Sequence, residues 1–407
     1  MKNPTFKIAA AAMMVAGAFA TQANAAGFQL SEQSSIQIGR AMAGAGVVGD
    51  DLSAVHYNPA GMTLLSGTRM QATGTWVAVN LDYEGDSGQS ENGRLKGQTI
   101  PAGFITHQIN DSLWAGLALT VPYGMGTEYG ESWEGKSRGT ESMILTFDIN
   151  PNLAWKVNDK LSVGGGISLQ YAKAELGMGM DQMQANVKGD SWAWGWNVGL
   201  MFQPVETVRV GLAYRSHIAH NAEGHTDVKA GPLNLTSDMK VRIKTPDTVT
   251  LSATWEATDA LRLSGTARWS KWSNFRTLDV QNLDFNGTPY AKYANVPVEN
   301  NWDDTWFFSV GADYKLNGQW TVRGGVAYDQ GPVENQYRMA VIPDTDRVWF
   351  SGGASYKYTD NLTFDFGATY IKGVGDTDLY NEVGGQKIGE FKSLDSYIFS
   401  AQMQYLF

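Results

Sequence analysis

The residues best suited to metal chemistry are three histidines, His217, His220 and His225, which lie close together in the chain. Imidazole nitrogen is a common ligand of zinc and related metals. Successive side chains of an extended chain point to opposite faces, so His217 and His220, three positions apart, do not share a face. We therefore interpret all three as solvated loop residues and expect neither a metal nor any other cofactor.

Two acidic pairs, Asp303 with Asp304 and Asp344 with Asp346, offer carboxylates for general acid and base chemistry. A hydrolase would also need an activated nucleophile, but the sequence contains no Gly-x-Ser-x-Gly elbow and no histidine near these carboxylates. We expect no enzymatic activity. The acidic pairs are interpreted as solvated loop residues or as bridges to divalent ions.

The run from Gly44 to Gly49, followed by Asp50, matches the glycine fingerprint of dinucleotide binding. That motif functions only between a strand and a helix of a βαβ unit, and no such unit surrounds it here. The run is interpreted as a tight turn.

The N-terminus of the sequence has the features of an export signal. Lys2 and Lys7 precede an apolar run from Ile8 to Ala20, and Ala23-Asn24-Ala25 is the small-x-small pattern that a signal peptidase cuts. Residues 1 to 25 are therefore predicted to be a signal peptide. No later run approaches the roughly 20 apolar residues of a membrane helix, so any membrane crossing must use strands.

Composition narrows the class further. The sequence has no cysteine, which excludes disulfides and a lipid-anchored N-terminal cysteine. Its formal net charge is −10, which becomes −12 without Lys2 and Lys7 and argues against nucleic acid as a partner. The 14 Trp and 17 Tyr suit a membrane interface. Composition alone also allows a large soluble β-protein such as a secreted lectin.

Periodicity favours a barrel. In the last segment Tyr397, Phe399 and Met403 share one face while Ser400 and Gln402 share the other, the period-two pattern of a membrane strand. Similar alternation covers residues 192–202, 208–214, 249–255, 261–269, 306–314, 320–328, 348–358 and 362–370. The whole chain from Arg69 onward is predicted to form about fourteen strands, an even number as such barrels require.

The connections between these segments alternate in length. Short polar turns are predicted near residues 110, 158, 204, 258, 317 and 360, and long loops near 84–97, 223–237, 275–300, 329–345 and 372–392. Short turns on one rim and long loops on the other are typical of an outer-membrane barrel. The fold class is therefore all-β, a transmembrane antiparallel barrel of about 14 strands.

The segment between the cleavage site and Arg69 does not alternate. It contains a helix-like stretch from Ser31 to Ala43, a region rich in Gly and Ala, and then Tyr57-Asn58-Pro59-Ala60-Gly61. It could be a periplasmic tail or a plug folded inside the barrel. Its small residues and low charge favour the plug.

Several motifs together resemble one known family. These are Ala26-Gly27-Phe28-Gln29-Leu30, Gly39-Arg40-Ala41, Asn58-Pro59-Ala60, Val121-Pro122-Tyr123-Gly124, Trp269-Ser270-Lys271-Trp272-Ser273, and Ile342-Pro343-Asp344-Thr345-Asp346-Arg347 with Trp349. Their order and content are similar to those of the FadL family of outer-membrane long-chain fatty acid transporters. The resemblance covers essentially the whole mature chain.

The resemblance implies an N-terminal hatch over residues 26 to 67 and a fourteen-stranded barrel over residues 68 to 407. It also implies passive uptake of a hydrophobic ligand that enters a deep pocket and leaves sideways where the third strand kinks. On this basis Phe28, Asn58, Pro59 and Ala60 are expected to gate the channel, and Pro122, Tyr123 and Gly124 to form the lateral exit. Pro122 would itself remove a donor from the strand ladder.

One departure from the family bears on the ligand. The two basic side chains that hold the ligand carboxylate in the family fall near Met178 and Val298 here, and neither is basic. Arg268, Arg276 or Arg323 could replace them. Long-chain fatty acids are the expected ligands; the alternatives are neutral monoaromatic hydrocarbons, as admitted by relatives in that family, and the wide aqueous pore of a general porin.

The remaining expectations concern surroundings. We expect a monomer in the outer membrane of a Gram-negative cell, in contact with outer-membrane lipid and lipopolysaccharide. Its ligands are expected to be fatty acids or other hydrophobic small molecules. We expect no nucleic acid partner.

Overall fold

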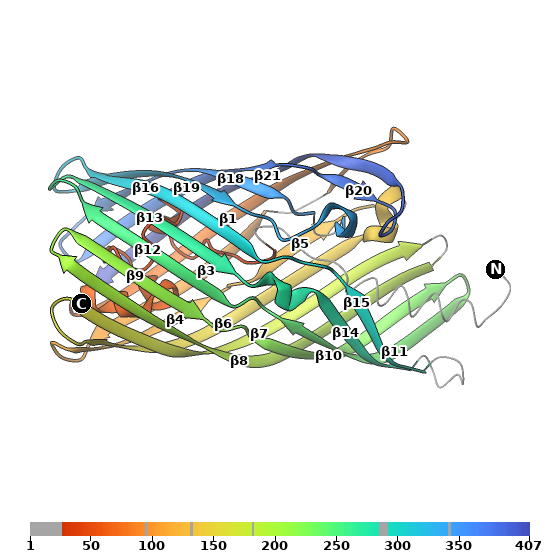
Figure 1. Cartoon of the computed structure of the whole chain (residues 1–407), viewed down its shortest axis with the longest axis horizontal. Helices are drawn as coiled ribbons and strands as arrows, with labels where there is room; N and C mark the ends of the chain where they lie inside the picture. The colour runs from red at the N-terminus through yellow and green to blue at the C-terminus, as the bar shows by residue number, and fades with distance from the viewer. Residues whose placement is uncertain (1–26, 94–96, 131–132, 181–182, 285–291, 341–342) are drawn as a thin grey trace.

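The computed structural model describes residues 27–93, 97–130, 133–180, 183–284, 292–340 and 343–407. Within them the chain forms one closed antiparallel β-barrel around a short, partly helical N-terminal segment (Figure 1). The predicted signal peptide, residues 1 to 25, lies outside the described residues. None of the described helices is long and apolar enough to cross a bilayer.

The predicted fourteen-stranded barrel is confirmed. Continuous wall strands are β1 (Thr68–Gly85), β3 (Gln98–Gln108), β6 (Glu141–Lys156), β7 (Leu161–Met180), β8 (Met183–Val205), β17 (Trp320–Asp329), β18 (Asp346–Lys357), β19 (Leu362–Val374) and β21 (Lys387–Leu406). Wall strands in two pieces are β4 (Leu113–Thr120) with β5 (Gly124–Glu128), β9 (Val208–Arg215) with β10 (Ala219–Ala230), β11 (Leu233–Lys244) with β12 (Thr248–Glu256), β13 (Leu261–Ser270) with β14 (Thr277–Asp284), and β15 (Lys292–Glu299) with β16 (Thr305–Lys315). Short strands β2 (Ser90–Gly93) and β20 (Asp378–Tyr380) pair with β1 and β21 at the long-loop end.

The first and last strands close the barrel. β1 pairs with β21 from Arg69 opposite Leu406 to Gly85 opposite Gly389, and with β3 on its other side. Closure removes the free edges, so the backbone groups of the wall are paired without water. A closed barrel of this kind can therefore reside in lipid.

The two faces of the wall differ as the alternation predicts. On β21 Phe399 is 55% exposed on the outer face, while its neighbours Ser400 and Gln402 are buried on the inner face. On β8 Trp194 is 70% exposed. Similar outward apolar side chains include Trp76, Trp155, Leu169, Leu251, Phe308, Val310, Phe350 and Phe366. So extensive an apolar surface is untenable in water and suits a lipid environment.

Two of the predicted long loops contain paired strands. Residues 223–237 form part of the β10–β11 hairpin, which pairs from Ala219 opposite Lys244 to Ala230 opposite Leu233. Similarly, β14 and β15 pair within the predicted loop 275–300, from Thr277 opposite Glu299. On the β10–β11 hairpin the outward side chains are polar, as at Glu223, His225 and Lys240, whereas Val228, Leu235 and Met239 face inward and are buried. The hairpin therefore lacks the apolar outer face by which the other strands were recognised.

The N-terminal segment, residues 27–67, lies inside the barrel, and we call it the inner segment (Figure 1). It contains helix α2 (Ser35–Gly39), helix α3 (Ala54–Tyr57) and the 3-10 helix η1 (Pro59–Leu64). α2 packs against β17, β18, β19 and β21, whereas η1 packs against β4, β6, β7 and β8. The inner segment therefore touches opposite parts of the wall.

The helix is shorter than the stretch predicted from Ser31 to Ala43. The Ser34 side chain accepts a hydrogen bond from the Gln37 N–H and caps the first turn. Ala41 and Met42 then adopt positive φ angles of 52° and 65°, which end the helix. The wall accommodates the inner segment closely: a Cβ on Gly199 would lie 2.0 Å from Asn58 Oδ1.

Candidate functional site

Phe28, near the start of the inner segment, sits in an aromatic cage. Its ring lies 5.1 Å from Trp272, 5.5 Å from Tyr123 and 5.7 Å from Phe275 between centroids, each edge to face. Trp302 packs against both Trp272 and Phe275. Edge-to-face pairs of this kind add about 0.5–1.5 kcal/mol each beyond area burial. Phe28 is only 3% exposed, so the cage holds the N-terminal end of the inner segment firmly.

The backbone before Phe28 is shaped by the same cage. Gly27 has a φ of 71°, and a Cβ there would lie 2.3 Å from the Trp272 ring. Its N–H donates to Asp344 Oδ2 at 3.5 Å. Asp344 is 1% exposed, so the interpretation of this carboxylate as a solvated loop residue is wrong; it is buried against the inner segment.

Of the two positions expected near the ligand, Met178 is buried in the apolar cluster that contains Phe28, together with Leu176, Ala185 and Val187. Val298 lies on β15 opposite Leu278, and its side chain is outside the described part of the structure. Met178 thus contributes apolar surface beside the cage and no charge.

The proposed cationic substitutes have other partners. Arg323 donates to Asp313 from Nε at 3.0 Å, and Arg276 is exposed and paired with Asp303. Arg268 is 8% exposed, donates to Ser31 Oγ at 2.8 Å and lies over the Phe307 ring. Only Arg268 of these three reaches the N-terminal part of the inner segment.

The third wall strand is interrupted beside the cage. β4 ends at Thr120 and β5 begins at Gly124, so Val121, Pro122 and Tyr123 lie outside both ladders. Pro122 has no N–H to offer the ladder. Strand residues of β6 remain paired on either side, Asp148 with Thr120 and Leu145 with Gly124.

The inner segment fills this interruption. The Leu30 N–H donates to the Pro122 carbonyl at 2.8 Å, and the Gly124 N–H donates to the Phe28 carbonyl at 3.0 Å. The Gln33 side chain donates to the Val121 carbonyl at 2.8 Å and accepts from its N–H at 3.3 Å. Phe28 to Leu30 therefore act as a short substitute strand at the break. The structure thus brings Phe28 and Tyr123 together.

A cavity of about 230 Å³ opens at the break, between β1 and β3 on one side and β5 and β6 on the other. Its lining is mostly apolar and includes Leu30, Val77, Ile100, Val121, Gly124, Ile144 and Leu145. We call it the lateral cavity. Glu32 and Arg347 are its charged lining residues among those described. Sequence reasoning missed both, although Arg347 ends the Pro-Asp-Thr-Asp-Arg motif.

Asn58, Pro59 and Ala60 lie against a different part of the wall. Asn58 Oδ1 accepts from the Ala60 N–H at 3.1 Å, and its Nδ2 donates to the Leu200 carbonyl of β8 at 3.1 Å. Ala60 is fully buried, in a cluster with Val47 and Met201. This turn fastens the inner segment to β8 of the wall.

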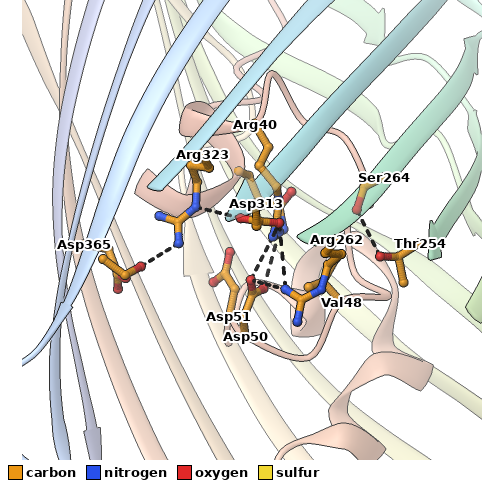
Figure 2. Close-up of polar contacts among 12 residues, drawn as sticks. Arg40, Val48, Asp50, Asp51, Thr254, Arg262, Ser264, Asp313, Arg323 and Asp365 are labelled. Carbon is orange, nitrogen blue, oxygen red and sulfur yellow. Dashed lines mark hydrogen bonds and ion pairs between the residues drawn. The ribbon is translucent and has the colours of Figure 1, made fainter. Parts of the chain in front are cut away.

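A buried charge network holds the middle of the inner segment (Figure 2). Arg40, fully buried, donates from Nη1 to Asp50 at 2.8 Å and to Asp313 of β16 at 3.0 Å. Arg262 of β13 also reaches Asp50, at 3.2 Å, and Arg323 of β17 reaches Asp313. Burial opposes ionisation of Asp50, but the two arginines outweigh it and lower its pKa well below the ordinary value.

Comparison with known proteins identifies the family. Residues 16–407 match the model of the outer membrane protein transport family described as OMPP1/FadL/TodX. The chain belongs to this family. Its members are outer-membrane transport proteins rather than enzymes, so the chain is an outer-membrane transporter of hydrophobic substrates.

Individual relatives agree with this assignment. The chain is 27% identical to a long-chain fatty acid transport protein of Escherichia coli O6:H1, over 92% of this chain and 93% of that protein. A crystal structure of a Pseudomonas aeruginosa FadL homologue is 25% identical, with a TM-score of 0.84 over 93% of this chain and 99% of that one. The Pseudomonas putida toluene transporter TodX shares the fold, with a TM-score of 0.74 at 16% identity over 95% and 100% of the two chains.

Replacing Phe28 with alanine should release the N-terminal end of the inner segment. Truncating a buried Phe costs about 3–5 kcal/mol, and here the loss falls on the cage. The chain lacks cysteine, so a single cysteine introduced at Gln29 can report exposure. We expect its maleimide labelling to accelerate at least tenfold in F28A. The outward Phe399→Ala, which removes an equal ring from the outer face, should leave labelling unchanged; equal rates in all three proteins would contradict the anchoring role.

Replacing Asp313 with asparagine should loosen the middle of the inner segment. Arg40 and Arg323 would lose a buried anionic acceptor, and removing one partner of a buried pair costs about 3–5 kcal/mol. We expect larger current fluctuations when the variant is placed in planar bilayers. The barrel should stay folded, as shown by a gel mobility that differs between unheated and heated samples. Asp159→Asn, in an exposed short turn, is the matched control. Quiet, unchanged currents in D313N would show that the network does not restrain the inner segment.

Proposed function

We propose that this protein takes up long-chain fatty acids passively, from the cell exterior through the cage around Phe28 to the lateral cavity, and from there into the outer membrane. The observation that carries the proposal is the position of the lateral cavity. Its lining runs from Leu30, inside the barrel, to Leu145, which is 47% exposed on the outer face. A path through the wall at this point would deliver an apolar chain directly to lipid.

Physical chemistry supports a sideways route. Burial of each methylene contributes about 0.8 kcal/mol, so a long alkyl chain gains from apolar lining and loses from a wet pore. The alkyl chain gains the same free energy in lipid. The free energy of transfer from the cavity to the membrane is therefore close to zero, and the transfer needs no energy source. In this proposal Asn58, Pro59 and Ala60 hold the hatch, residues 26 to 67, while Phe28 and the kink residues Pro122, Tyr123 and Gly124 move or yield.

A second candidate ligand is a neutral monoaromatic hydrocarbon. The cage of Phe28, Trp272, Phe275 and Trp302 offers faces and edges suited to a small ring, and Met178 beside it is apolar. A general porin is not supported by an inner segment that is mostly buried against the wall. We further propose a monomer, with lipid against the outer apolar band and lipopolysaccharide against the long-loop rim.

The two ligand classes can be separated by transport. Cells that lack their own fatty acid transporter and express this protein would be given labelled oleate or labelled toluene. Saturable oleate uptake above that of cells with empty vector is the expected result, because the lateral cavity suits an extended chain. Uptake of toluene alone would overturn the fatty acid proposal and favour the hydrocarbon.

Replacing Gly124 with valine should block the lateral route. A Cβ at this position would lie 2.9 Å from Leu30 Cδ1, at the mouth of the lateral cavity, and a β-branched residue favours a continuous strand. We expect oleate uptake to fall at least tenfold while the barrel stays folded. Gly74→Val is the control, because a Cβ at Gly74 on β1 meets nothing within 4 Å. Normal uptake by folded G124V would refute the lateral exit.

A further inference from the structure

The inner end of the lateral cavity is chemically unlike its apolar lining. Glu32 is 2% exposed, and its Oε2 has no hydrogen-bond partner among the residues that the structure describes. Arg347 is 5% exposed, and its Nε also has no partner within the described part of the chain. A buried polar atom left without a partner destabilises the fold, and more so when it is charged. Both residues line the lateral cavity. Glu32 Oε2 can accept a hydrogen bond or carry a proton, and Arg347 Nε can donate one, so the two atoms together point to a ligand group that would bond to both.

Glu32 lies among several buried charged groups. It faces Arg347 of β18, Arg268 of β13 and Asp329 of β17, and it also influences Tyr57 of α3. Arg347 is already shared with Asp329 at 3.1 Å and with Asp344 at 3.6 Å. Among the described residues the groups that act on Glu32 are therefore two guanidinium groups and one carboxyl, and Arg338 lies beside Asp344. Burial is the main reason that the pKa of Glu32 rises to about 7, so this carboxyl carries a proton in much of the population near neutral pH.

We propose that Glu32 and Arg347 form a head-group site for a carboxylic acid in the lateral cavity. The Arg347 Nε–H donates to one ligand oxygen, and Glu32 Oε2 shares one proton with the other. The alkyl chain lies along the apolar lining towards Leu145. This inference rests on the proposed function, because it assigns the place where a fatty acid would be held.

The site selects by hydrogen bonding. A hydrocarbon would leave both Glu32 Oε2 and Arg347 Nε unpaired, and an alcohol could not bridge them as a planar carboxyl does. An amine would meet the Arg347 cation. A carboxyl group satisfies both atoms at once, so the site supplies the cation that Met178 does not. A role in binding the head group also accounts for the acidic Glu32 beside an apolar cavity.

Binding of a carboxylate at this site should depend on pH. A fatty acid has an ordinary carboxyl pKa near 4.5, so at neutral pH the shared proton comes from Glu32. Asp344, whose pKa burial raises to about 6, is mostly ionised above pH 7, and the arginines remain cationic. Between pH 7 and pH 9 the change in protonation is therefore mainly that of Glu32. Oleate affinity should fall at least tenfold over this interval.

Binding to the full protein in phosphatidylcholine nanodiscs tests the site. Labelled oleate and labelled oleyl alcohol would be titrated at pH 7, 8 and 9, with empty nanodiscs as the blank. Oleate should show the tenfold loss, and oleyl alcohol should bind equally at all three values. Glu32→Gln keeps the shape and supplies a permanent N–H donor, so its oleate affinity should become independent of pH. Glu32→Leu should lose at least tenfold in oleate affinity at pH 7 and keep oleyl alcohol.

The exposed Glu206→Gln, in the short turn after β8, is the matched control and should behave as the unmodified protein. The pH profile of the unmodified protein needs no substitution, so it remains informative if the leucine variant does not fold. Oleate binding that is unaffected by pH and by Glu32→Gln would overturn the head-group site and leave the fatty acid proposal standing. Absence of oleate binding and uptake, with toluene uptake intact, would overturn both.

Discussion

The rest of the structure depends on the backbone pairing between the inner segment and the break in the third wall strand. A wall in lipid cannot leave N–H and C=O groups unpaired, because no water is there to satisfy them. At the break the inner segment supplies partners to the backbone of Val121, Pro122 and Gly124 from Gln33, Leu30 and Phe28. Tyr123 bonds instead to Thr146 of β6. The seal is therefore made of a few hydrogen bonds between two segments that are not neighbours in a continuous sheet. A seal of this kind can open without unfolding the barrel.

The inner segment is held in three places of different strength. Its N-terminal end depends on the cage around Phe28, its middle on the charges around Arg40, and its last part on the Asn58 turn against β8. A hydrophobic ligand can compete for apolar and aromatic contacts, but it offers nothing to replace a buried ion pair. Ligand-driven movement should therefore be confined to the cage and the substitute strand, with α2 and the Asn58 turn remaining in place.

Much of this architecture could be predicted from the sequence because the information is local. Alternation along a strand such as β21 needs only neighbouring residues, and closure into an even-stranded barrel follows from the avoidance of free edges. The β10–β11 hairpin was missed because its apolar side chains face inward and its polar side chains outward, the reverse of the membrane-strand pattern. The Arg40–Asp313 pair joins residues 273 positions apart, and Glu32 belongs to no motif. Their roles depend on tertiary packing, which no local pattern reports.

The polar interior provides a separate reason for a sideways route. Inner-face groups such as Asn150 and Asn197 bond to each other at 2.9 Å, and Arg215 donates to Ser168 and to the His56 carbonyl. Beyond them, towards the short turns, lies the network of Arg40 and Asp313. An alkyl chain moving straight down this lumen would have to displace hydrogen bonds that it cannot replace. The lateral cavity, lined by Leu30 of the inner segment, is mostly apolar and lies away from this region. In the proposed route, the polar floor that stabilises the inner segment would therefore also direct a hydrophobic ligand through the wall.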